Sequence, residues 1–418
     1  MAALVDRVLQ EVDAARDEIV EFAAELVRVP SVNPPGEAYQ ECARVLGDRL
    51  ERLGCEVRYL VADDRPEHSE RYPRVNVVGA LAGSAPSGGP VLHLNGHLDV
   101  VPPGHGWTMD PWEGVVRDGR LYGRGSSDMK AGLAAAVFAL EALRRAGVSL
   151  AGTVEISGTA DEESGGHAGV AWLAEQGHLT SARTDYVIIP EPFGPGRICV
   201  GHRGVYWFDL VTRGRTAHGS MPFLGVNAID SMSRVLDAVR DELVPRLADR
   251  ETRLPVVPDP ARRATLNLNA IEGGQTGPAA QTPCVPDRCV VTFDRRVLPE
   301  ESLDAVMAEI DEIVAAVGVD CARFDRMVVP PVRTPDNGPL VQALAAAVET
   351  VVDAPAQEVA SPGTYDHKHV TRIGGIEQCV AYGPGTLEQA HQPDEWCKVE
   401  DIVQATKVLA LTTHALVG

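Results

Sequence analysis

The sequence predicts an α/β fold in which ligand residues lie just beyond the carboxyl ends of buried strands. Four short apolar runs have the character of such strands: 91–94, 154–156, 187–189 and 379–382. A helical stretch at 131–146 separates the first two runs, as expected for an alternating α/β sheet. Polar residues follow each run, at the edge where such sheets place their sites.

A second, smaller α+β domain is expected as an insertion. The chain has 418 residues, and a single hydrophobic core stops growing at roughly 250–300 residues. The stretch 203–321 combines strand-like runs at 205–211, 265–271 and 289–295 with helical spacing at 226–243 and 303–317. Breakers at 194–196 and 330–331 flank it. We therefore assign residues 1–202 and 322–418 to the larger domain and 203–321 to the insert.

The charge of the chain excludes some partners. A net charge of -21 and a pI near 5.0, without a Lys/Arg cluster, argue against nucleic acid and against an anionic membrane surface. No apolar run is long enough to span a bilayer, and residues 1–29 are amphipathic and unlike a signal peptide. The eight cysteines are scattered without a C-x-x-C pair, so we expect reduced thiols and a cytoplasmic protein.

Five residues offer a mixed set of nitrogen and oxygen donors: His97, Asp128, Glu163, Glu191 and His391. Two imidazoles and three carboxylates suit zinc or a similar divalent ion. If five ligands hold two metals, one carboxylate must bridge ions that lie roughly 3.5–4 Å apart. Taken alone, each residue also has a simpler interpretation. A histidine after a strand is often solvated, Asp128 could cap a helix, and Glu162 and Glu163 could form a solvated turn.

Motifs along nearly the whole chain resemble one family of zinc-dependent metallopeptidases. They are NGHLDVVP at 95–102, LYGRGSSDMK at 121–130, DEE at 161–163, PEP at 190–192, AHG at 217–219, IEGG at 271–274, and GPG at 383–385 before AH at 390–391. The family contains aminoacylase, acetylornithine deacetylase, succinyl-diaminopimelate desuccinylase and glutamate carboxypeptidase. The resemblance implies a zinc-peptidase-like catalytic domain, with the insert as a lid and dimerisation domain of a homodimer.

The resemblance also implies the ligand set. His97 and Glu191 would hold one zinc ion, Glu163 and His391 the other, and Asp128 would bridge them. Cobalt could take the place of zinc.

Other residues receive roles by the same resemblance. Glu162 would be the general base that activates a metal-bridging water. Asp99 would orient the imidazole of His97. His218 would reach an active site, often that of the partner subunit, and hydrogen-bond the oxygen of the tetrahedral intermediate. The Asp128–Met129 peptide would be cis.

Substrate contacts are less well defined by the sequence. Family members with Glu at the position of Glu191 tend to be deacylases or carboxypeptidases, whereas members with Asp tend to be aminopeptidases or dipeptidases. Arg296 matches a family arginine that can grip a substrate carboxylate, although it could instead be a salt-bridged strand residue. Further candidates for substrate contact are Asn267, Gly363, Thr364 and Lys368.

Three departures from the family pattern leave the acyl group and the amine component unassigned. The segment SPGTYDHKH at 361–369 lacks the usual second arginine, which Lys368 or a histidine could replace. Pro283 stands where relatives often have Asn, and Lys130-Ala131-Gly132 replaces Lys-Gly-Gly.

We therefore predict a metal-dependent hydrolase that cleaves the amide bond of an N-acyl amino acid or a related small, carboxylate-bearing amide. The alternative on the same scaffold is a dinuclear zinc dipeptidase or aminopeptidase. A binding module with a dead metal site is a third hypothesis, which the presence of all five ligands and Glu162 disfavours.

Overall fold

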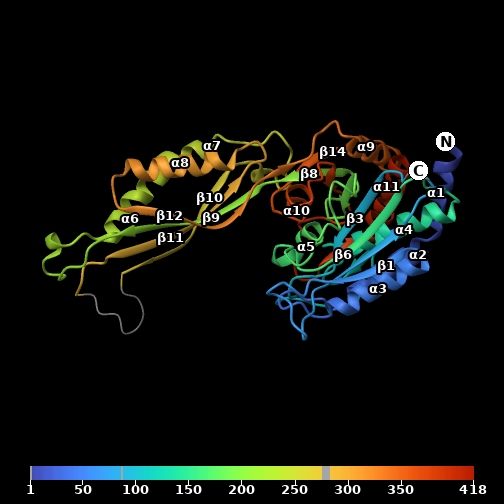
Figure 1. Cartoon of the computed structure of the whole chain (residues 1–418), viewed down its shortest axis with the longest axis horizontal. Coiled ribbons are helices and arrows are strands. Elements are labelled where there is room, and N and C mark those ends of the chain that lie inside the picture. The colour runs from blue at the N-terminus through green and yellow to red at the C-terminus, as the bar shows by residue number, and fades with distance from the viewer. Residues whose placement is uncertain (1, 86–87, 275–282) are drawn as a thin grey trace. The chain divides into compact units, whose positions relative to one another are not determined.

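The chain folds into two units, each with its own β-sheet (Figure 1). The computed structural model describes residues 2–85, 88–274 and 283–418. The first unit comprises Met1–Val200, Thr334–Val359 and Tyr365–Gly418, and the second comprises Gly201–Arg333 and Ala360–Thr364. The second unit is therefore an insertion into the first.

A mixed sheet forms the centre of the first unit. Its strands are β1 (Glu56–Val61), β2 (Val75–Leu81), β3 (Val91–His97), β6 (Thr153–Thr159), β7 (Tyr186–Ile189), β8 (Arg197–His202), β13 (Val332–Arg333), β14 (Gln357–Ser361) and β15 (Cys379–Ala381). In the described residues their order is β1-β2-β6-β3-β7-β15-β8-β13, with β14 paired to β8. The neighbours β6, β3, β7 and β15 run parallel, so their carboxyl ends meet at one edge. These four strands are the four predicted apolar runs, which confirms the alternating α/β sheet.

Helices cover both faces of this sheet. They are α1 (Ala2–Ala14), α2 (Arg16–Val27), α3 (Tyr39–Arg52), α4 (Lys130–Arg145), α5 (Val170–Glu175), α9 (Pro339–Val352), α10 (His367–Arg372) and α11 (Val399–Val417). The paired residues Gly96 and Gly158 lie against Leu133 of α4 and Leu46 of α3, so these two helices share one face. Side chains of α5 and α10 pack with those of β7 and β15 on the opposite face.

A small sheet tethers the loop that precedes α4. Its strands are β4 (Val115–Arg117), β5 (Arg120–Tyr122) and β16 (Trp396–Lys398), in the order β16-β5-β4. The pairing of Cys397 with Leu121 brings the segment after His391 beside the strand that leads to Asp128.

The second unit is an antiparallel sheet with helices on one face (Figure 1). Its strands are β9 (Gly204–Arg213), β10 (Thr265–Gly273), β11 (Arg288–Val297) and β12 (Cys321–Val329), in the order β10-β11-β9-β12. The helices are α6 (Ala228–Ala238), α7 (Val244–Ala248) and α8 (Leu303–Ala316). Phe208, Met232 and Ile310 belong to a core cluster formed within this unit.

The end of the insert differs from the boundary drawn from the sequence. That boundary follows residue 321, whereas the second unit continues to Arg333 and also takes in Ala360–Thr364. The reason is that β12 pairs along β9 and completes the smaller sheet. A strand at the edge of an insert shows the same local pattern whichever sheet receives it, so this assignment depends on pairing.

Among the described residues, no helix has both the length and the apolar character needed to cross a bilayer.

Candidate metal centre

The predicted ligands gather at the carboxyl edge of the parallel strands. His97 is the last residue of β3, and Glu163 lies in the short 3-10 turn after β6. Glu191 follows β7, and His391 lies in the loop between β15 and β16. Asp128 ends the loop before α4, and its peptide bond to Met129 is cis, as the resemblance implied. The sequence-predicted residues therefore come together because each follows or adjoins an element of one sheet edge.

The orientation of His97 leaves Nε2 free for a cation. Its ring is buried, and Nδ1 lies 2.9 Å from the backbone oxygen of Asp99. A carbonyl oxygen only accepts, so Nδ1 carries the proton and Nε2 presents its lone pair. Nε2 faces Oδ1 of Asp128 at 3.1 Å. This is the usual arrangement of a metal-ligating imidazole, whose other nitrogen donates to a protein acceptor.

Asp128 lies between the two histidines. Its Oδ1 faces His97, and its Oδ2 lies 3.5 Å from Nε2 of His391. His391 Nε2 also lies 3.1 Å from Oε2 of Glu163. Donor atoms of His97, Asp128 and Glu191 lie within 4.8 Å of one another, and so do those of Asp128, Glu163 and His391. The two groups share only Asp128, which is the geometry required of a bridging carboxylate.

The charges of this centre fit two cations. Glu191 is 5% exposed, and within the described part of the chain its carboxylate accepts no hydrogen bond. A buried carboxylate without a partner is costly unless a cation neutralises it. Burial raises the pKa of Glu191 well above its ordinary value, and the nearby carboxylate of Asp128 adds to the rise. The residues present therefore suit a pair of divalent ions.

Asp99 contacts His97 through its backbone oxygen, and its side chain has other partners. The backbone oxygen of Asp99 receives the imidazole N–H, while Oδ1 lies 3.6 Å from Nδ1. The buried carboxylate accepts instead from the backbone N–H groups of Glu162 at 3.2 Å and Glu163 at 3.1 Å. It also accepts from Asn33 Nδ2 at 2.9 Å. One side chain thus links the β3 ligand to the turn that carries the two glutamates.

A second buried network holds the same turn from the other side. Asp161 adopts a left-handed backbone conformation with φ of 62° immediately before Glu162. Its carboxylate accepts from Arg74 Nε at 2.8 Å and from the hydroxyl of Tyr39 at 2.7 Å. Arg74 also donates to the backbone oxygen of Pro35 at 2.8 Å. These contacts fix a conformation that few residues other than glycine adopt readily.

Glu162 differs from its neighbour Glu163 in having no partner. In the described residues its carboxylate makes no hydrogen bond or ion pair, whereas Glu163 faces His391. Burial raises the pKa of Glu162 to about 8, against the opposing charges of Lys368 and His97. An unliganded carboxyl whose pKa lies near neutrality has the properties of a general base.

The unusual segment 365–369 contributes one free cation. His367 and His369 are buried, and burial lowers the pKa of each to about 3. His369 Nε2 donates to the backbone oxygen of Gly165 at 2.7 Å. Lys368 is 6% exposed, and its ammonium makes no hydrogen bond or ion pair with any described residue. Of the three basic side chains, Lys368 is the one that remains available to an anion.

The other candidates lie in the second unit. Arg296 pairs with Asp294 through Nε at 3.0 Å and Nη2 at 3.2 Å, as the alternative interpretation of a salt-bridged strand residue expected. Asn267 donates to the side chain of Asn269, and Gly363 N donates to Ser361 Oγ at 3.2 Å. Thr364 belongs to the same segment of this unit.

His218 is exposed and has a defined tautomer. The backbone N–H of Ser220 donates to its Nδ1 at 3.2 Å. Nδ1 is therefore the acceptor of the ring, and the neutral imidazole carries its proton on Nε2. Among the residues that the structure describes, this nitrogen has no hydrogen-bond partner, so it can donate to an oxygen.

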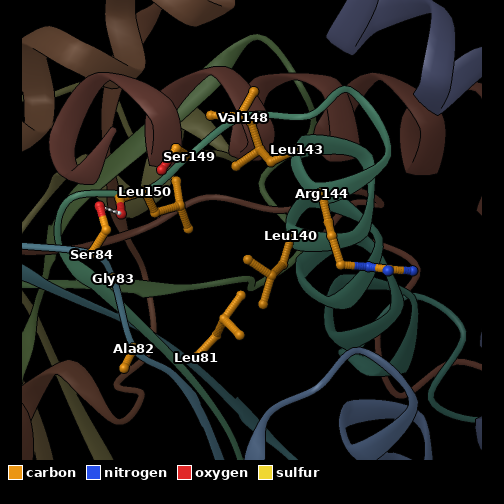
Figure 2. Close-up of a pocket in the computed structure, with 10 residues that line it drawn as sticks. All are labelled: Leu81, Ala82, Gly83, Ser84, Leu140, Leu143, Arg144, Val148, Ser149 and Leu150. Carbon is orange, nitrogen blue, oxygen red and sulfur yellow. Dashed lines mark hydrogen bonds between the residues drawn. The ribbon is translucent and has the colours of Figure 1, made fainter.

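A separate cavity in the first unit carries none of these residues (Figure 2). It has a volume of about 240 Å³ and is lined by the end of β2, one side of α4 and residues 148–150. Those segments precede or follow the strands at the edge opposite to the ligands, and Leu81, Leu140 and Leu150 make its lining largely apolar. It is not the metal centre.

Residues 93–415 match the peptidase family M20/M25/M40. The chain belongs to this family. As a member, it is a metal-dependent hydrolase of amide or peptide bonds. A succinyl-diaminopimelate desuccinylase from Xanthomonas euvesicatoria pv. vesicatoria is 30% identical over 393 residues, which cover 92% of this chain and 95% of that protein. One from Thioalkalivibrio sulfidiphilus is 27% identical over 397 residues, 94% of this chain and 96% of that protein.

Solved structures of M20-type enzymes share the fold. Aminopeptidase PepT from Bacillus cereus superposes with a TM-score of 0.74 at 22% identity, covering 96% of this chain and 98% of that one. The Bacillus subtilis YXEP protein, a dinuclear metal-binding peptidase of the M20 family, gives a TM-score of 0.69 at 17% identity, covering 97% and 99%. These likenesses concern the fold alone.

Sequence reasoning missed the residues that hold the ligand turns. Asn33, Arg74 and Tyr39 lie far from the motifs along the chain, and each acts through a contact that only the fold creates. The available signal was the acid Asp161 directly before Glu162, but its partners could not be chosen from many basic and hydroxyl side chains.

Proposed function

We propose that this M20/M25/M40 peptidase is a deacylase that removes an acyl group from an N-acyl amino acid or a similar small, carboxylate-bearing amide. The observation that carries the proposal is the unpartnered carboxylate of Glu162 beside two donor groups that share Asp128. This combination supplies a base next to a place for two cations, which is what hydrolysis of an amide near neutral pH requires.

The chain's own residues perform the proton transfers. When bound, a pair of divalent ions, for which we propose zinc with cobalt as a substitute, would lower the pKa of a water and polarise the amide carbonyl. Glu162 takes the proton from the attacking water and delivers it to the leaving nitrogen. Asp99 accepts hydrogen bonds from the backbone N–H of Glu162 and from the imidazole of His97. The base and the ligand therefore keep fixed positions relative to each other.

The proposed substrate class rests on the names of two relatives and on the ammonium group of Lys368. The two relatives described above are named desuccinylases, whose substrate carries carboxylates. Lys368 lies near Glu162, and its ammonium has no partner among the described residues, so it is suited to a substrate carboxylate. Arg296 is the less favoured anchor, because Asp294 already engages Nε and Nη2 of its guanidinium.

A substrate screen tests the reaction class. N-acetyl, N-succinyl, N-formyl and N-carbamoyl amino acids are assayed beside unblocked dipeptides and tripeptides. We expect turnover of blocked substrates, with Lys368→Ala raising KM more than it lowers kcat. Turnover of unblocked peptides alone would establish the dipeptidase or aminopeptidase alternative.

Metal removal tests the chemistry. Exhaustive chelation is expected to abolish activity, and zinc or cobalt to restore it. Asp128→Ala is expected to lower metal content more than His391→Ala, because only Asp128 belongs to both donor groups. Full activity in metal-free protein would contradict the mechanism.

We further propose a homodimer in which His218 acts on the active site of the partner subunit. Two observations support this: the free Nε2 donor of His218, and the exposed apolar side chains that follow it, with Phe223 78% and Leu224 54% exposed. Donation to the developing oxyanion is a role whose loss costs ~10²- to 10³-fold in rate.

Mixed dimers test this role. His218→Ala and Glu162→Gln proteins are each expected to be nearly inactive, yet a mixed dimer pairs one intact metal site with one intact donor. With random exchange at equal mixing, about a quarter of wild-type activity should return. No recovery despite verified exchange would place His218 in its own subunit or outside the reaction.

The compartment is proposed to be the cytoplasm. None of the eight cysteines, all of which lie in the described residues, forms a disulfide, and seven are at least partly buried, which fits a reducing environment.

A further inference from the structure

The carboxylate of Glu395 accepts hydrogen bonds from several backbone N–H groups of the loop that ends at Asp128. Glu395 lies between His391 and β16 and is fully buried. Its Oε1 accepts from the N–H groups of Gly125 at 3.1 Å, Ser127 at 2.9 Å and Asp128 at 3.1 Å. Its backbone oxygen accepts from Gly123 N at 2.9 Å. The segment that carries His391 therefore supplies the hydrogen-bond acceptors for these four backbone N–H groups of the Asp128 loop.

Arg124 closes the same network from within the loop. It is 2% exposed and pairs with Oε2 of Glu395 through Nη1 at 2.6 Å. The guanidinium also donates to the backbone oxygens of Gln392 at 3.2 Å and Pro103 at 3.2 Å. Its carbon lies 5.2 Å from the ring centroid of Trp107. Arg124 thus joins three segments: its own loop, the turn after His391, and the chain beyond Asp99.

The loop needs an external acceptor because it cannot pair its own amides. Gly123 and Gly125 have φ of 143° and 86°, so the loop is neither helix nor strand, and several N–H groups converge on one point. Such a nest binds an anion, and each buried N–H left without an acceptor is costly. Here the anion is a side chain of the protein, and the buried guanidinium balances its charge.

We infer that Glu395 and Arg124 form a positioning clasp that sets Asp128 and His391 relative to each other, and thereby tunes metal affinity at both ions. Asp128 belongs to both donor groups, and His391 belongs to one of them. A change in the clasp should therefore weaken both sites together. Neither residue contacts a ligand side chain, so both act only through the backbone they hold. The inference rests on the proposed metal centre.

Zinc binding to Glu395→Gln is the direct test. The amide oxygen can still accept from the three N–H groups, but its NH₂ then faces the guanidinium of Arg124, donor against donor. We expect Kd for Zn²⁺, measured by competition with a chelating indicator, to rise ~10- to 100-fold at both sites, as for other groups that support metal ligands.

Glu141→Gln is the matched control. Glu141 is also a buried carboxylate, 5% exposed, and pairs with Arg49 and Arg145 in the helical layer. It holds no ligand segment, so its loss should lower the melting temperature and leave Kd for Zn²⁺ unchanged. If Glu395→Gln lowers the melting temperature to a similar extent and binds zinc like the wild type, the clasp is structural only and the inference is wrong.

Arg124→Lys keeps the inference testable if Glu395→Gln fails to fold. Lysine retains the charge but cannot reach Glu395, Gln392 and Pro103 with one planar group. It should bind both zinc ions more weakly than wild type, by less than the Glu395 variant. Wild-type affinity in folded Arg124→Lys would overturn the clasp. Failure of the wild-type protein itself to bind two zinc ions would instead overturn the proposed metal centre.

Discussion

At the residue scale, two adjacent glutamates acquire different properties from their surroundings. The backbone N–H groups of both residues donate to the carboxylate of Asp99, so they share one rigid turn. Glu163 faces His391, whereas Glu162 has no partner in the described residues and its pKa rises through burial. Position within the turn, and not residue type, therefore separates the proposed ligand from the proposed base.

This difference predicts opposite outcomes for two conservative substitutions. Glu162→Gln keeps the shape and removes the basicity, so kcat should fall at least ~10²- to 10⁴-fold with metal content unchanged. Glu163→Gln should lose metal, because it removes a charged donor from the group with Asp128 and His391. Metal analysis beside kinetics distinguishes them. Metal loss in Glu162→Gln with retention in Glu163→Gln would show that the two roles are reversed.

The same carboxyl predicts a pH dependence of the metal-free protein. Burial raises the pKa of Glu162 from 4.5 to about 8, so between these values the folded state holds a proton that the unfolded state has released. Stability from this group is therefore present below pH 4.5 and is lost as the pH rises through about 8. Chelated wild type should lose melting temperature across this window more steeply than chelated Glu162→Gln. Equal slopes would contradict the assignment.

At the scale of elements, α4 packs unusually closely on the segment that carries Glu191. A Cβ added at Gly132 would collide with the backbone oxygen of Pro190, the residue before this ligand. The preceding residue, Ala131, is also fully buried. The close packing of α4 against the loop that contains Pro190 thus depends on Gly132.

Two glycine substitutions test this packing. In a helix, Gly→Ala normally stabilises by ~0.5–1 kcal/mol. Gly132→Ala should instead destabilise by ~1–3 kcal/mol through overpacking, because the obstacle is backbone. Gly47→Ala in α3 meets only the hydroxyl end of Tyr59, which is 41% exposed and can rotate away, so its stability should stay or rise. Chemical denaturation of both variants measures the difference, and equal effects would contradict the packing argument.

At the scale of the whole molecule, the main part of the insert begins at the end of β8 and ends at β13. Gly201 pairs with Arg333 and His202 with Val332, where β8 and β13 run antiparallel. The insert has its own core cluster. A region with its own core and closely spaced ends can usually be removed without unfolding the rest.

Removal of the insert tests this independence. Residues 203–331 are replaced by Asn-Gly, the preferred sequence of a two-residue hairpin between antiparallel strands. The shortened chain should unfold cooperatively and bind two zinc ions, since all five candidate ligands remain. It should be inactive, because the proposed oxyanion donor His218 is gone. An aggregated chain, or one that binds no zinc, would show that the first unit depends on the second for folding.

The sequence by itself determined the central strands, the family and the set of candidate ligands. Each of these is encoded locally: a buried strand is a short apolar run, and each ligand follows or adjoins such an element within a recognisable motif. Chain order then places the parallel strands' ends at one edge, so the five donors were predictable together.

Only the tertiary structure determined which side-chain contacts fix the loops at that edge of the sheet. Glu395 and Ser127, for example, are 268 residues apart in the chain, and Asp161 contacts Arg74 and Tyr39 across 87 and 122 residues. The addition of β12 to the smaller sheet is likewise a matter of pairing with β9. Such contacts join side chains with no local pattern, and many equivalent partners exist in the sequence. The fold selects among them by bringing particular buried polar groups within hydrogen-bond distance of one another.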